Sequence, residues 1–537
     1  MKTKSNIDRH SALQFITQAE RKPRPEDESI TGTVSEKAVD VIGIFMSIPT
    51  TLRGAVTRIF SDRRIVVGES GKSGLHAGVR LSAAIALGKM TGTLSRRLQR
   101  GGGTTMPGRV ARAIEPRVLP LLSQRLRCGS VIIAGTNGKT TTASLLAHIM
   151  RTAGRHPVHN RAGANLAAGI ASALVEHADL HGRPAGDIGI FEIDEATVPR
   201  VAPHLAPRVA VFTNLFRDQL DRYGEIDHIA GLWRATAAAL PRGIALVANG
   251  DDPLVYEALR GLPARLVTFG IEDARHALPA IEHTAEARYC YRCGTPYHYA
   301  LTYFGHMGRY RCPTCGTARP VPDIAARDIA LAGPDGARFT LAAGGESVQA
   351  ATVLPGLYNV YNVLAASAAA LQVGVPLDQL GQALATFAPA FGRAERITVA
   401  GAEVRMLLSK NPAGFNEVLR TVLSGGGVPA ILVAINDNIA DGRDVSWLWD
   451  VDFEMLAGRV DRVIVTGLRA EDMALRLRYA GLGDESVEVY PEYEGALRAA
   501  VAQASGRPLF VLPTYTAMLA LRDVLRRWGV VGRFWEH

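Results

Sequence analysis

Apolar positions between residues 129 and 374 fall into short uninterrupted runs that alternate with longer stretches of mixed polarity. The runs have the length of buried strands, and the stretches between them carry apolar residues at helical spacing. Such an alternation is typical of a mostly parallel sheet covered by helices on both faces. The expected strands include 130–135, 188–194, 209–214 and 243–250, and the expected helices include 143–154, 228–240 and 357–374.

Two further patterns follow this series. Residues 328–353 alternate between apolar and polar positions and contain turn signals, which predicts a β-hairpin. From near residue 400 onward, four strands alternate with four helices over about 137 residues. That is the size and rhythm of one compact Rossmann-like domain.

The N-terminal part of the chain does not show this alternation of strands and helices. Residues 1 to about 70 are polar and predict a flexible tail. Residues 72–108 have the pattern of a helix with small and basic side chains, closed by a glycine run. The expected division is a tail over 1–70, a basic segment over 71–128, a central α/β domain over 129–396 and a C-terminal α/β domain over 397–537.

The positive charge of the chain is concentrated in one segment. Of a formal net charge of +9, residues 53–127 carry fifteen Lys and Arg against three acids, whereas residues 1–52 carry seven of each sign. A basic segment of this kind could meet nucleic acid, an anionic membrane surface or an acidic partner, or it could be a solvated arginine-rich face.

No apolar run approaches the roughly eighteen residues needed to span a bilayer. The run 41–50 is too short, and residues 1–40 lack the order of regions expected of a signal peptide. The sequence therefore predicts a cytoplasmic protein, and it leaves open a contact of the basic segment with the cytoplasmic face of the membrane.

Four of the five cysteines form two Cys-x-x-Cys pairs, Cys290 with Cys293 and Cys312 with Cys315. This spacing predicts a structural Cys₄ zinc ribbon, inserted over 286–320. Four thiolates fill a tetrahedral shell and leave no position for a catalytic water. The aromatic residues between the pairs could stack bases, as in nucleic-acid zinc ribbons, or pack the sides of the ribbon itself.

A phosphate-binding loop is predicted where the first strand meets the first helix of the central domain. Small residues in "AGTNGKTTT" can present backbone N–H groups to an anion, and the following helix N-terminus favours negative charge. Lys139 can reach the phosphates, and Thr140 can offer its hydroxyl to Mg²⁺. The expected nucleotide contacts are Gly135, Thr136, Asn137, Gly138, Lys139, Thr140 and Thr141.

This loop resembles the ATP loop of the Mur ligase superfamily, and six further segments resemble that family in the same order. They are "NRAGAN" (160–165), "FEIDEA" (191–196), "TNLFRDQLDRYGE" (213–225), "NGDDP" (249–253), "LPGLYNVYN" (354–362) and "FGRAER" (391–396). The resemblance implies ATP-driven formation of an acyl phosphate on a carboxylate, followed by attack of an amine. It implies catalytic roles for Lys139 and Glu192, with Glu192 as a Mg²⁺ ligand, and adenine contact by Asn362. Asp251 and Asp252 would lie near the nucleotide or would cap the next helix.

Two departures narrow the resemblance. Gln219 stands where typical members have a histidine that binds a second metal, and ordinary members lack a four-cysteine insertion. Together with "LLSKNPAGFNEVL" and "INDNIADGRDVSWLWD" in the C-terminal part, these features are similar to the ligase subunits of lipid II isoglutaminyl synthase. That branch implies amidation of the D-glutamate α-carboxylate of lipid II with ammonia from a GatD-like glutaminase subunit. No nucleic acid takes part in the implied reaction.

The cysteine inventory agrees with an ammonia source on another chain. A glutaminase needs a nucleophilic cysteine with a base beside it, yet the fifth cysteine, Cys128, directly precedes a buried strand. The acidic loop after the strand at 429–435 offers Asp437, Asp441 and Asp444. The resemblance implies that one of the three orients the catalytic histidine of the partner, whereas any one of them could instead be a turn residue.

Three questions stay open at the level of sequence. Lys410 and Asn411 fit either the active site or a helix start. Another amide ligase of the superfamily, such as a folylpolyglutamate synthase, is a rival function. A non-enzymatic, ATP-dependent nucleic-acid binder built on the cysteine insert and the basic segment is a second rival, and it predicts salt-sensitive binding of DNA or RNA.

Overall fold

A computed structural model describes residues 73–97, 104–160, 164–217, 226–389 and 393–532. The tail expected over 1–70 and Gln219 lie outside these ranges. Within them, no helix has both the length and the hydrophobicity that crossing a bilayer requires.

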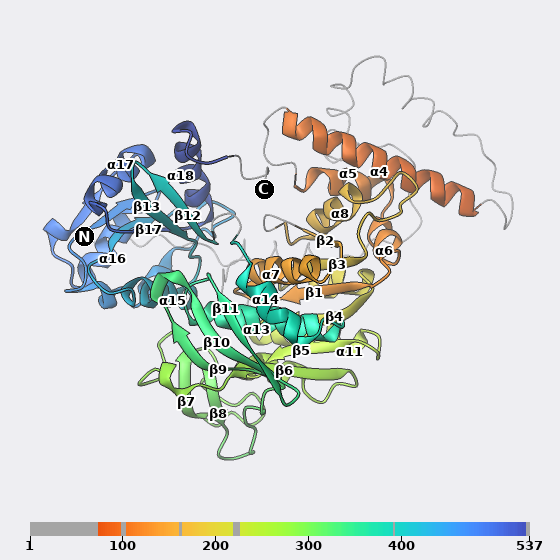
Figure 1. Ribbon diagram of the computed structural model, residues 1–537, viewed down its shortest axis with the longest axis horizontal. Coiled ribbons are helices and arrows are strands. Elements are labelled where there is room, and N and C mark those ends of the chain that lie inside the picture. Colours follow the sequence, from red (N-terminus) through yellow and green to blue (C-terminus); the bar gives the residue numbers. More distant parts are fainter. Residues whose placement is uncertain (1–72, 98–103, 161–163, 218–225, 390–392, 533–537) are drawn as a thin grey trace, which may run out of the picture. The chain divides into compact units, whose positions relative to one another are not determined.

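The larger sheet has nine strands in the order β11-β10-β9-β6-β5-β4-β1-β3-β2 (Figure 1). Seven neighbours in this order, from β9 to β2, run parallel, and β10 and β11 add an antiparallel hairpin at one edge. The mostly parallel sheet and the hairpin are thus as predicted. The strands are β1 (Ser130–Ala134), β2 (Pro157–His159), β3 (Ile188–Glu192), β4 (Pro207–Phe212), β5 (Ala245–Asn249), β6 (Arg265–Ile271), β9 (Ile324–Leu331), β10 (Ala337–Ala343) and β11 (Glu346–Thr352).

Helices cover both faces of this sheet because its strands are apolar on both sides. Along β1, Val131 and Ile133 join one buried cluster, while Ile132 and Ala134 join the other. The first cluster lies under α7 (Lys139–Thr152), α13 (Leu357–Gln372) and α14 (Leu377–Ala385). The second lies under α4 (Ser73–Arg97), α5 (Met106–Ile114), α6 (Val118–Ser123), α8 (Ala167–Glu176), α9 (Val198–Val201), α11 (Ile226–Ala239) and α12 (Pro253–Leu259).

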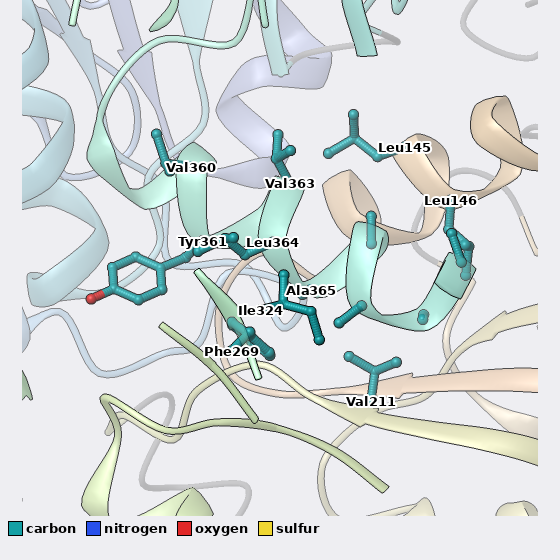
Figure 2. Close-up of a cluster of buried hydrophobic side chains, with 14 of the residues drawn as sticks. Leu145, Leu146, Val211, Phe269, Ile324, Val360, Tyr361, Val363, Leu364 and Ala365 are labelled. Carbon is teal, nitrogen blue, oxygen red and sulfur yellow. The ribbon is translucent and has the colours of Figure 1, made fainter. Parts of the chain in front are cut away.

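The core beneath α13 fixes the position of the loop before α7. Figure 2 shows side chains of α13 next to Leu145 and Leu146 of α7 and above Val211 of β4. Tyr361 of α13 belongs to the same cluster, and its hydroxyl donates a 2.7 Å hydrogen bond to Asp251 Oδ2. Burial of this many aliphatic side chains, each contributing roughly 1.5–3 kcal/mol, holds both helices against the sheet.

The smaller sheet has six strands in the order β12-β13-β17-β14-β15-β16. The prediction of four strands was therefore too low. Five strands follow residue 400, of which β16 is only three residues long. β12 ends at Val399, before the expected start of the series, and pairs antiparallel with β13 across a tight turn at Ala400 and Gly401. Its strands are β12 (Arg393–Val399), β13 (Ala402–Leu407), β14 (Ala430–Ala434), β15 (Val463–Thr466), β16 (Val487–Val489) and β17 (Leu509–Pro513).

Four helices cover the smaller sheet, as the sequence predicts. α15 (Pro412–Leu423) and α16 (Ala470–Tyr479) share one buried cluster with the short helices η4 (Ser446–Asp450) and η5 (Phe453–Leu456). α17 (Tyr493–Ala504) and α18 (Tyr515–Arg527) lie on the opposite face. The cysteine insert forms its own two-stranded sheet, β7 (His298–Phe304) with β8 (Met307–Arg311).

Candidate functional site

A cavity of about 360 Å³ lies at the carboxyl end of β1 and β3, where a parallel sheet presents its functional groups. One wall comes from the loop before α7, from the end of β3 and from α13. The other wall comes from the loop after β13 and from α15, beside the smaller sheet, and includes Ser409, Lys410, Gly414 and Glu417. The structure thus brings most of the predicted central-domain residues and the "SKNPAGFNE" stretch into one site.

The loop Gly135–Gly138 is shaped by two glycines that no larger residue can replace. Gly135 has a φ of +147°, and a Cβ there would lie 1.9 Å from Thr213 Oγ1. Gly138 has a φ of +83°, and a Cβ there would lie 1.9 Å from Asn362 Oδ1. The backbone of Asn137 is held between them: its N–H donates to Asn214 Oδ1 at 2.8 Å, and its carbonyl accepts from Asn214 Nδ2 at 3.1 Å.

Lys139 is a buried cation folded over this loop. Its side chain is 7% exposed, and Nζ donates to the carbonyls of Gly135 and Thr136 and lies 3.1 Å from Glu195 Oε1. One carboxylate and two backbone carbonyls therefore hold the ammonium group in place, and Lys139 lines the cavity. An anionic ligand such as a phosphate would find a fixed positive charge here.

Glu192 ends β3 beside the first turn of α7. Thr140 Oγ1 donates a 2.6 Å hydrogen bond to Glu192 Oε2, so the two predicted Mg²⁺ ligands already touch. Asn160 fixes the backbone of Glu192 through two hydrogen bonds of 2.9 Å. A hydroxyl and a carboxylate that meet at the end of the loop Gly135–Gly138 form a donor set that suits Mg²⁺.

Asp194 and Glu195, which follow Glu192 at the end of β3, also line the cavity. Sequence analysis gave neither a role, although both lie within the quoted "FEIDEA". The sequence does carry a signal, because Glu192, Asp194 and Glu195 place three acids in four positions at the end of a strand. Only the structure shows that Glu195 pairs with Lys139.

Asn362, for which adenine contact is expected, lies against the loop and lines the cavity, whereas the aspartates after β5 do not line it. Asn362 Oδ1 packs on Gly138 and lies 3.5 Å from Thr142 Oγ1. Asp252 caps α12 by accepting the N–H groups of Leu254 and Val255, so its role as a helix cap is confirmed. Asp251 is fully buried and ion-paired with Arg319, at 2.6 Å. Burial raises the pKa of Asp251, which Arg319 opposes.

Asn411 joins the two walls and also begins a helix. Its Nδ2 donates to Asn137 Oδ1 at 2.8 Å, and its Oδ1 accepts from Asn137 Nδ2 at 3.3 Å. The same Oδ1 accepts the N–H of Gly414 at 2.9 Å and caps α15. The helix-start alternative is therefore confirmed for Asn411, whereas its part in the active site stays a prediction.

The three aspartates of the loop after β14 have different surroundings. Asp441 is buried and accepts both the N–H and the hydroxyl of Thr516, and burial raises its pKa. Asp437 is ion-paired with Arg469 at 2.6 Å. Asp444 is exposed and accepts the N–H of Ser446 at 2.8 Å, and hydrogen bonds from Ser446 lower the pKa of its carboxyl.

The four cysteines of the insert gather at the end of the β7–β8 hairpin away from the cavity. Their Sγ atoms all lie within 4.8 Å of one another, and the closest pairs are 3.4 and 3.5 Å apart. In a tetrahedral Zn²⁺ site with bonds of about 2.3 Å, sulfurs stand about 3.8 Å apart, so the cluster fits zinc. Hydrogen bonding to Thr317 lowers the pKa of the Cys315 thiol to about 6, whereas the pKa of the Cys312 thiol in the same cluster is raised to about 11.

Each Cys-x-x-Cys pair forms a tight turn closed by the following glycine. Gly294 N–H donates to Cys290 O at 2.8 Å, and Gly316 N–H donates to Cys312 O at 3.1 Å. Both glycines have a φ near +70°, a conformation that strains any residue with a side chain. His306 is completely buried 3.4 Å from Asp252 Oδ2 rather than beside the cysteines, which agrees with a full set of thiolates.

Comparison with known proteins gives the class of this fold. Residues 133–370 match the family described as Mur ligase middle domain, and residues 408–518 match the family described as MurT ligase C-terminal. A solved pseudomurein peptide ligase type C from Methanothermus fervidus shares the fold with a TM-score of 0.57 at 24% identity, over 75% of this chain and 79% of that one. The chain is thus a Mur ligase-type α/β protein.

Two relatives are similar over nearly their whole length. Both carry the name lipid II isoglutaminyl synthase (glutamine-hydrolyzing) subunit MurT. The Staphylococcus aureus protein is 33% identical over 84% of this chain and 98% of its own length. The Streptococcus pneumoniae protein is 30% identical over 81% and 94%. The chain belongs to the MurT family.

Proposed function

We propose that the chain is the ligase subunit of a lipid II isoglutaminyl synthase and forms a C–N bond during peptidoglycan synthesis. It uses ATP to convert the α-carboxylate of D-glutamate in the lipid II stem peptide into an acyl phosphate. Ammonia from a GatD-like glutaminase then displaces the phosphate and leaves D-isoglutamine. The observation that carries this proposal is the near full-length similarity to MurT proteins, in a chain whose phosphate-type loop faces the MurT-type wall across one cavity.

The residues around Lys139 fit the demands of carboxylate activation. A carboxylate and a triphosphate repel each other, so the site must supply positive charge and hold both in line. Lys139 supplies one charge, and Thr140 and Glu192 would hold Mg²⁺, which supplies a second when bound. The backbone of Gly135–Thr141 would hold the phosphates, and Asn362 would contact the adenine.

The four-cysteine cluster has a local structural role in this proposal. Zinc bound by Cys290, Cys293, Cys312 and Cys315 would have four protein ligands and no open position. The cysteines lie at the open end of the β7–β8 hairpin. Residues beside its turn contact the larger sheet region, since Gly308 N–H donates to Asp251 O and Tyr303 Oη donates to Ile271 O, and Phe304 lines the cavity. Zinc would therefore stabilise the floor of the site without taking part in the reaction.

A surface for the glutaminase is proposed on the smaller-sheet region, around α16. Large apolar side chains are exposed there, and two of them, Trp449 and Tyr479, pack with ring centroids 5.4 Å apart. A group of exposed apolar side chains of this kind is typical of a surface that binds another protein. The exposed Asp444 precedes Trp449 by five residues in the sequence. The exposed residues are Ile439, Trp449, Leu468, Leu475 and Tyr479.

The described part of the basic segment offers a place for an anionic surface. Arg125 and Arg127 line a second cavity together with His181 and Arg183. Lipid II carries a pyrophosphate and lies in the inner leaflet, so we propose peripheral contact of this region with the cytoplasmic face of the membrane. The division into a tail, a basic segment, a central domain (129–396) and a C-terminal domain (397–537) is part of the same proposal.

The experiment that tests this function uses the chain co-expressed with a glutaminase subunit. With glutamine, ATP and Mg²⁺, the complex should convert lipid II into its D-isoglutamine form and release ADP and phosphate. Mass spectrometry of the stem peptide measures the product. Glutamylation of a folate substrate by the same preparation, without amidation of lipid II, would favour the folylpolyglutamate synthase alternative instead.

Asp444→Asn should reduce amidation driven by glutamine without reducing amidation driven by added ammonia. Of the three candidate aspartates, Asp444 alone is exposed and without an ion-pair partner among the described residues, so it is our choice for the group that orients the partner's catalytic histidine. Loss of such a carboxylate costs roughly 10⁴-fold in a hydrolytic triad. We expect glutamine-driven amidation to fall by about that factor, while ammonium chloride still supports the wild-type rate.

The matched control is Asp450→Asn, an exposed aspartate in η4 that should leave both activities unchanged. Equal loss of the glutamine-driven and ammonia-driven rates in Asp444→Asn would place Asp444 in the ligase reaction and refute its assignment to the partner.

A further inference from the structure

A buried cluster of two carboxylates and one arginine forms part of the cavity wall contributed by α15. Glu417 lines the cavity and is 4% exposed. Arg420, three residues later, donates hydrogen bonds to the carboxylates of both Glu417 and Glu282. Two acids share one guanidinium, so the cluster carries excess negative charge next to the site where a carboxylate would be activated.

The two carboxylates of this cluster differ in their hydrogen-bond partners. Glu282 is committed to the fold: its Oε2 accepts the N–H of Gly305 in the β7–β8 turn, and Asn416 Nδ2 lies 3.4 Å from its Oε1. Glu417 uses only Oε1, toward Arg420. Among the described residues, no hydrogen bond reaches its Oε2. Because Oε2 has no such partner and is not among the buried atoms that lack one, it is open to the cavity that Glu417 lines and can accept a hydrogen bond from a ligand there.

The surroundings of Glu417 keep its proton exchangeable near neutral pH. Burial raises the pKa of Glu417 to about 7, Arg420 opposes this rise, and Glu282 adds to it. An ordinary carboxylate paired with one arginine would have a lowered pKa. A group with a pKa close to the working pH is the most effective proton acceptor in catalysis.

We propose that Glu417 binds the ammonia molecule in the cavity and accepts a proton from it as the amide bond forms. The proposal rests on the proposed function and names a residue for its second half-reaction. The nitrogen lone pair forms the C–N bond, the bond from carbon to the phosphate oxygen breaks, and phosphate leaves with that electron pair. One N–H proton passes to Glu417 Oε2 and then to water, so the carboxylate is restored.

Other charged groups also face this site. Lys410 lies on the same wall, and Lys139, Glu192, Asp194 and Glu195 lie on the opposite wall. Behind Glu417, Asn416 Nδ2 donates to Asp452 at 2.9 Å, and Glu282 and His283 act electrostatically on Asp452. Because the folded-state pKa of Glu417 is raised, its acceptor form increases as the pH rises through about 7. The rate per concentration of unprotonated ammonia should rise over the same range.

The test compares two nucleophiles in the full complex carrying Glu417→Gln. Hydroxylamine is a strong nucleophile that traps acyl phosphates, so hydroxamate formation on lipid II reports carboxylate activation alone. We expect hydroxamate formation to stay within a few-fold of wild type. Amidation by ammonium chloride should fall by about 10²-fold or more, the usual contribution of a general base, and the remaining rate per unprotonated ammonia should lose its dependence on pH.

The matched control is Glu282→Gln, which removes the other carboxylate from Arg420. It should keep amidation by ammonia and shift the pH midpoint to lower values, because Glu282 helps to raise the pKa of Glu417. Glu417→Asp, which retains a carboxylate, should recover part of the ammonia-driven rate and serves as the second variant if Glu417→Gln does not fold.

Parallel loss of hydroxamate and amide in Glu417→Gln, or an unchanged ammonia-driven rate, would refute the role of Glu417. If Glu417→Asp folds and recovers no ammonia-driven activity while hydroxamate still forms, the proposal is also refuted. Failure of the proposed function would look different, since the wild-type complex would then make neither hydroxamate nor amide from lipid II.

Discussion

Lys139→Ala should abolish ATP-dependent amidation of lipid II, with both glutamine and ammonium chloride as nitrogen sources. The ammonium group is the one lysine charge at the start of α7, and it lies over the loop that would hold the phosphates. Removing a single charge-stabilising donor typically costs about 10²–10³ in rate. Here the lost group would also align two anions that repel each other, so we expect at least the upper end of that range.

The stability of this variant must be measured alongside its activity. Lys139 is ion-paired with the buried Glu195, and an unpaired buried carboxylate costs roughly 3–5 kcal/mol. The melting temperature of the variant therefore has to be measured. A double variant, Lys139→Ala with Glu195→Gln, removes both charges of the ion pair and so leaves no unpaired carboxylate. The control is Arg151→Ala, an exposed change in the last turn of the same helix. A Lys139→Ala complex that stays fully active would overturn the assignment of this loop.

Cys312→Ser should release zinc and unfold the insert around residues 290–316. Cys312 is completely buried, and Cys293 Sγ lies 3.4 Å from its Sγ. Binding of structural zinc contributes on the order of 10 kcal/mol of folding free energy in small zinc modules. A loss of that size exceeds what the small apolar cluster of Tyr297, Tyr310 and the two buried cysteines can replace.

Metal content and hydrogen exchange measure this effect together. Zinc should fall from one equivalent to none, and amide protection should disappear first over β7 and β8. Activity should fall in proportion to the loss of folded hairpin, since Gly308, beside its turn, contacts Asp251. Cys128→Ser is the matched control, because Cys128 lies outside the cluster beside Arg155. Retention of zinc in Cys312→Ser would contradict the four-thiolate site.

Local sequence pattern was enough to predict the presence of both sheets and the position of the loop before α7, but it did not predict β2 or β6. The apolar runs at β1, β3, β4 and β5 are bounded by polar residues, and each became a buried strand. β12 was missed because it ends at Val399, before the expected start of the C-terminal series, and because three of its first four residues are charged.

The long-range pairings in the site could not be predicted from local pattern. Asn137 and Asn411 are 274 positions apart, and nothing in either neighbourhood signals their mutual hydrogen bonds. The same holds for Glu282 and Arg420, which join the cysteine insert to α15. The aspartates at 437, 441 and 444 looked equivalent because turn residues and functional residues share one composition, and only burial and partners distinguish them.

The most direct test of the central claim follows nitrogen from glutamine into lipid II. The chain and its co-expressed glutaminase are incubated with ATP, lipid II and glutamine labelled in the side-chain amide with heavy nitrogen. The account predicts that the label appears in the α-amide of D-isoglutamine, with one ADP and one phosphate formed for each amide. Glutamine hydrolysis and ATP turnover without labelled lipid II, or amidation that proceeds without ATP, would contradict it.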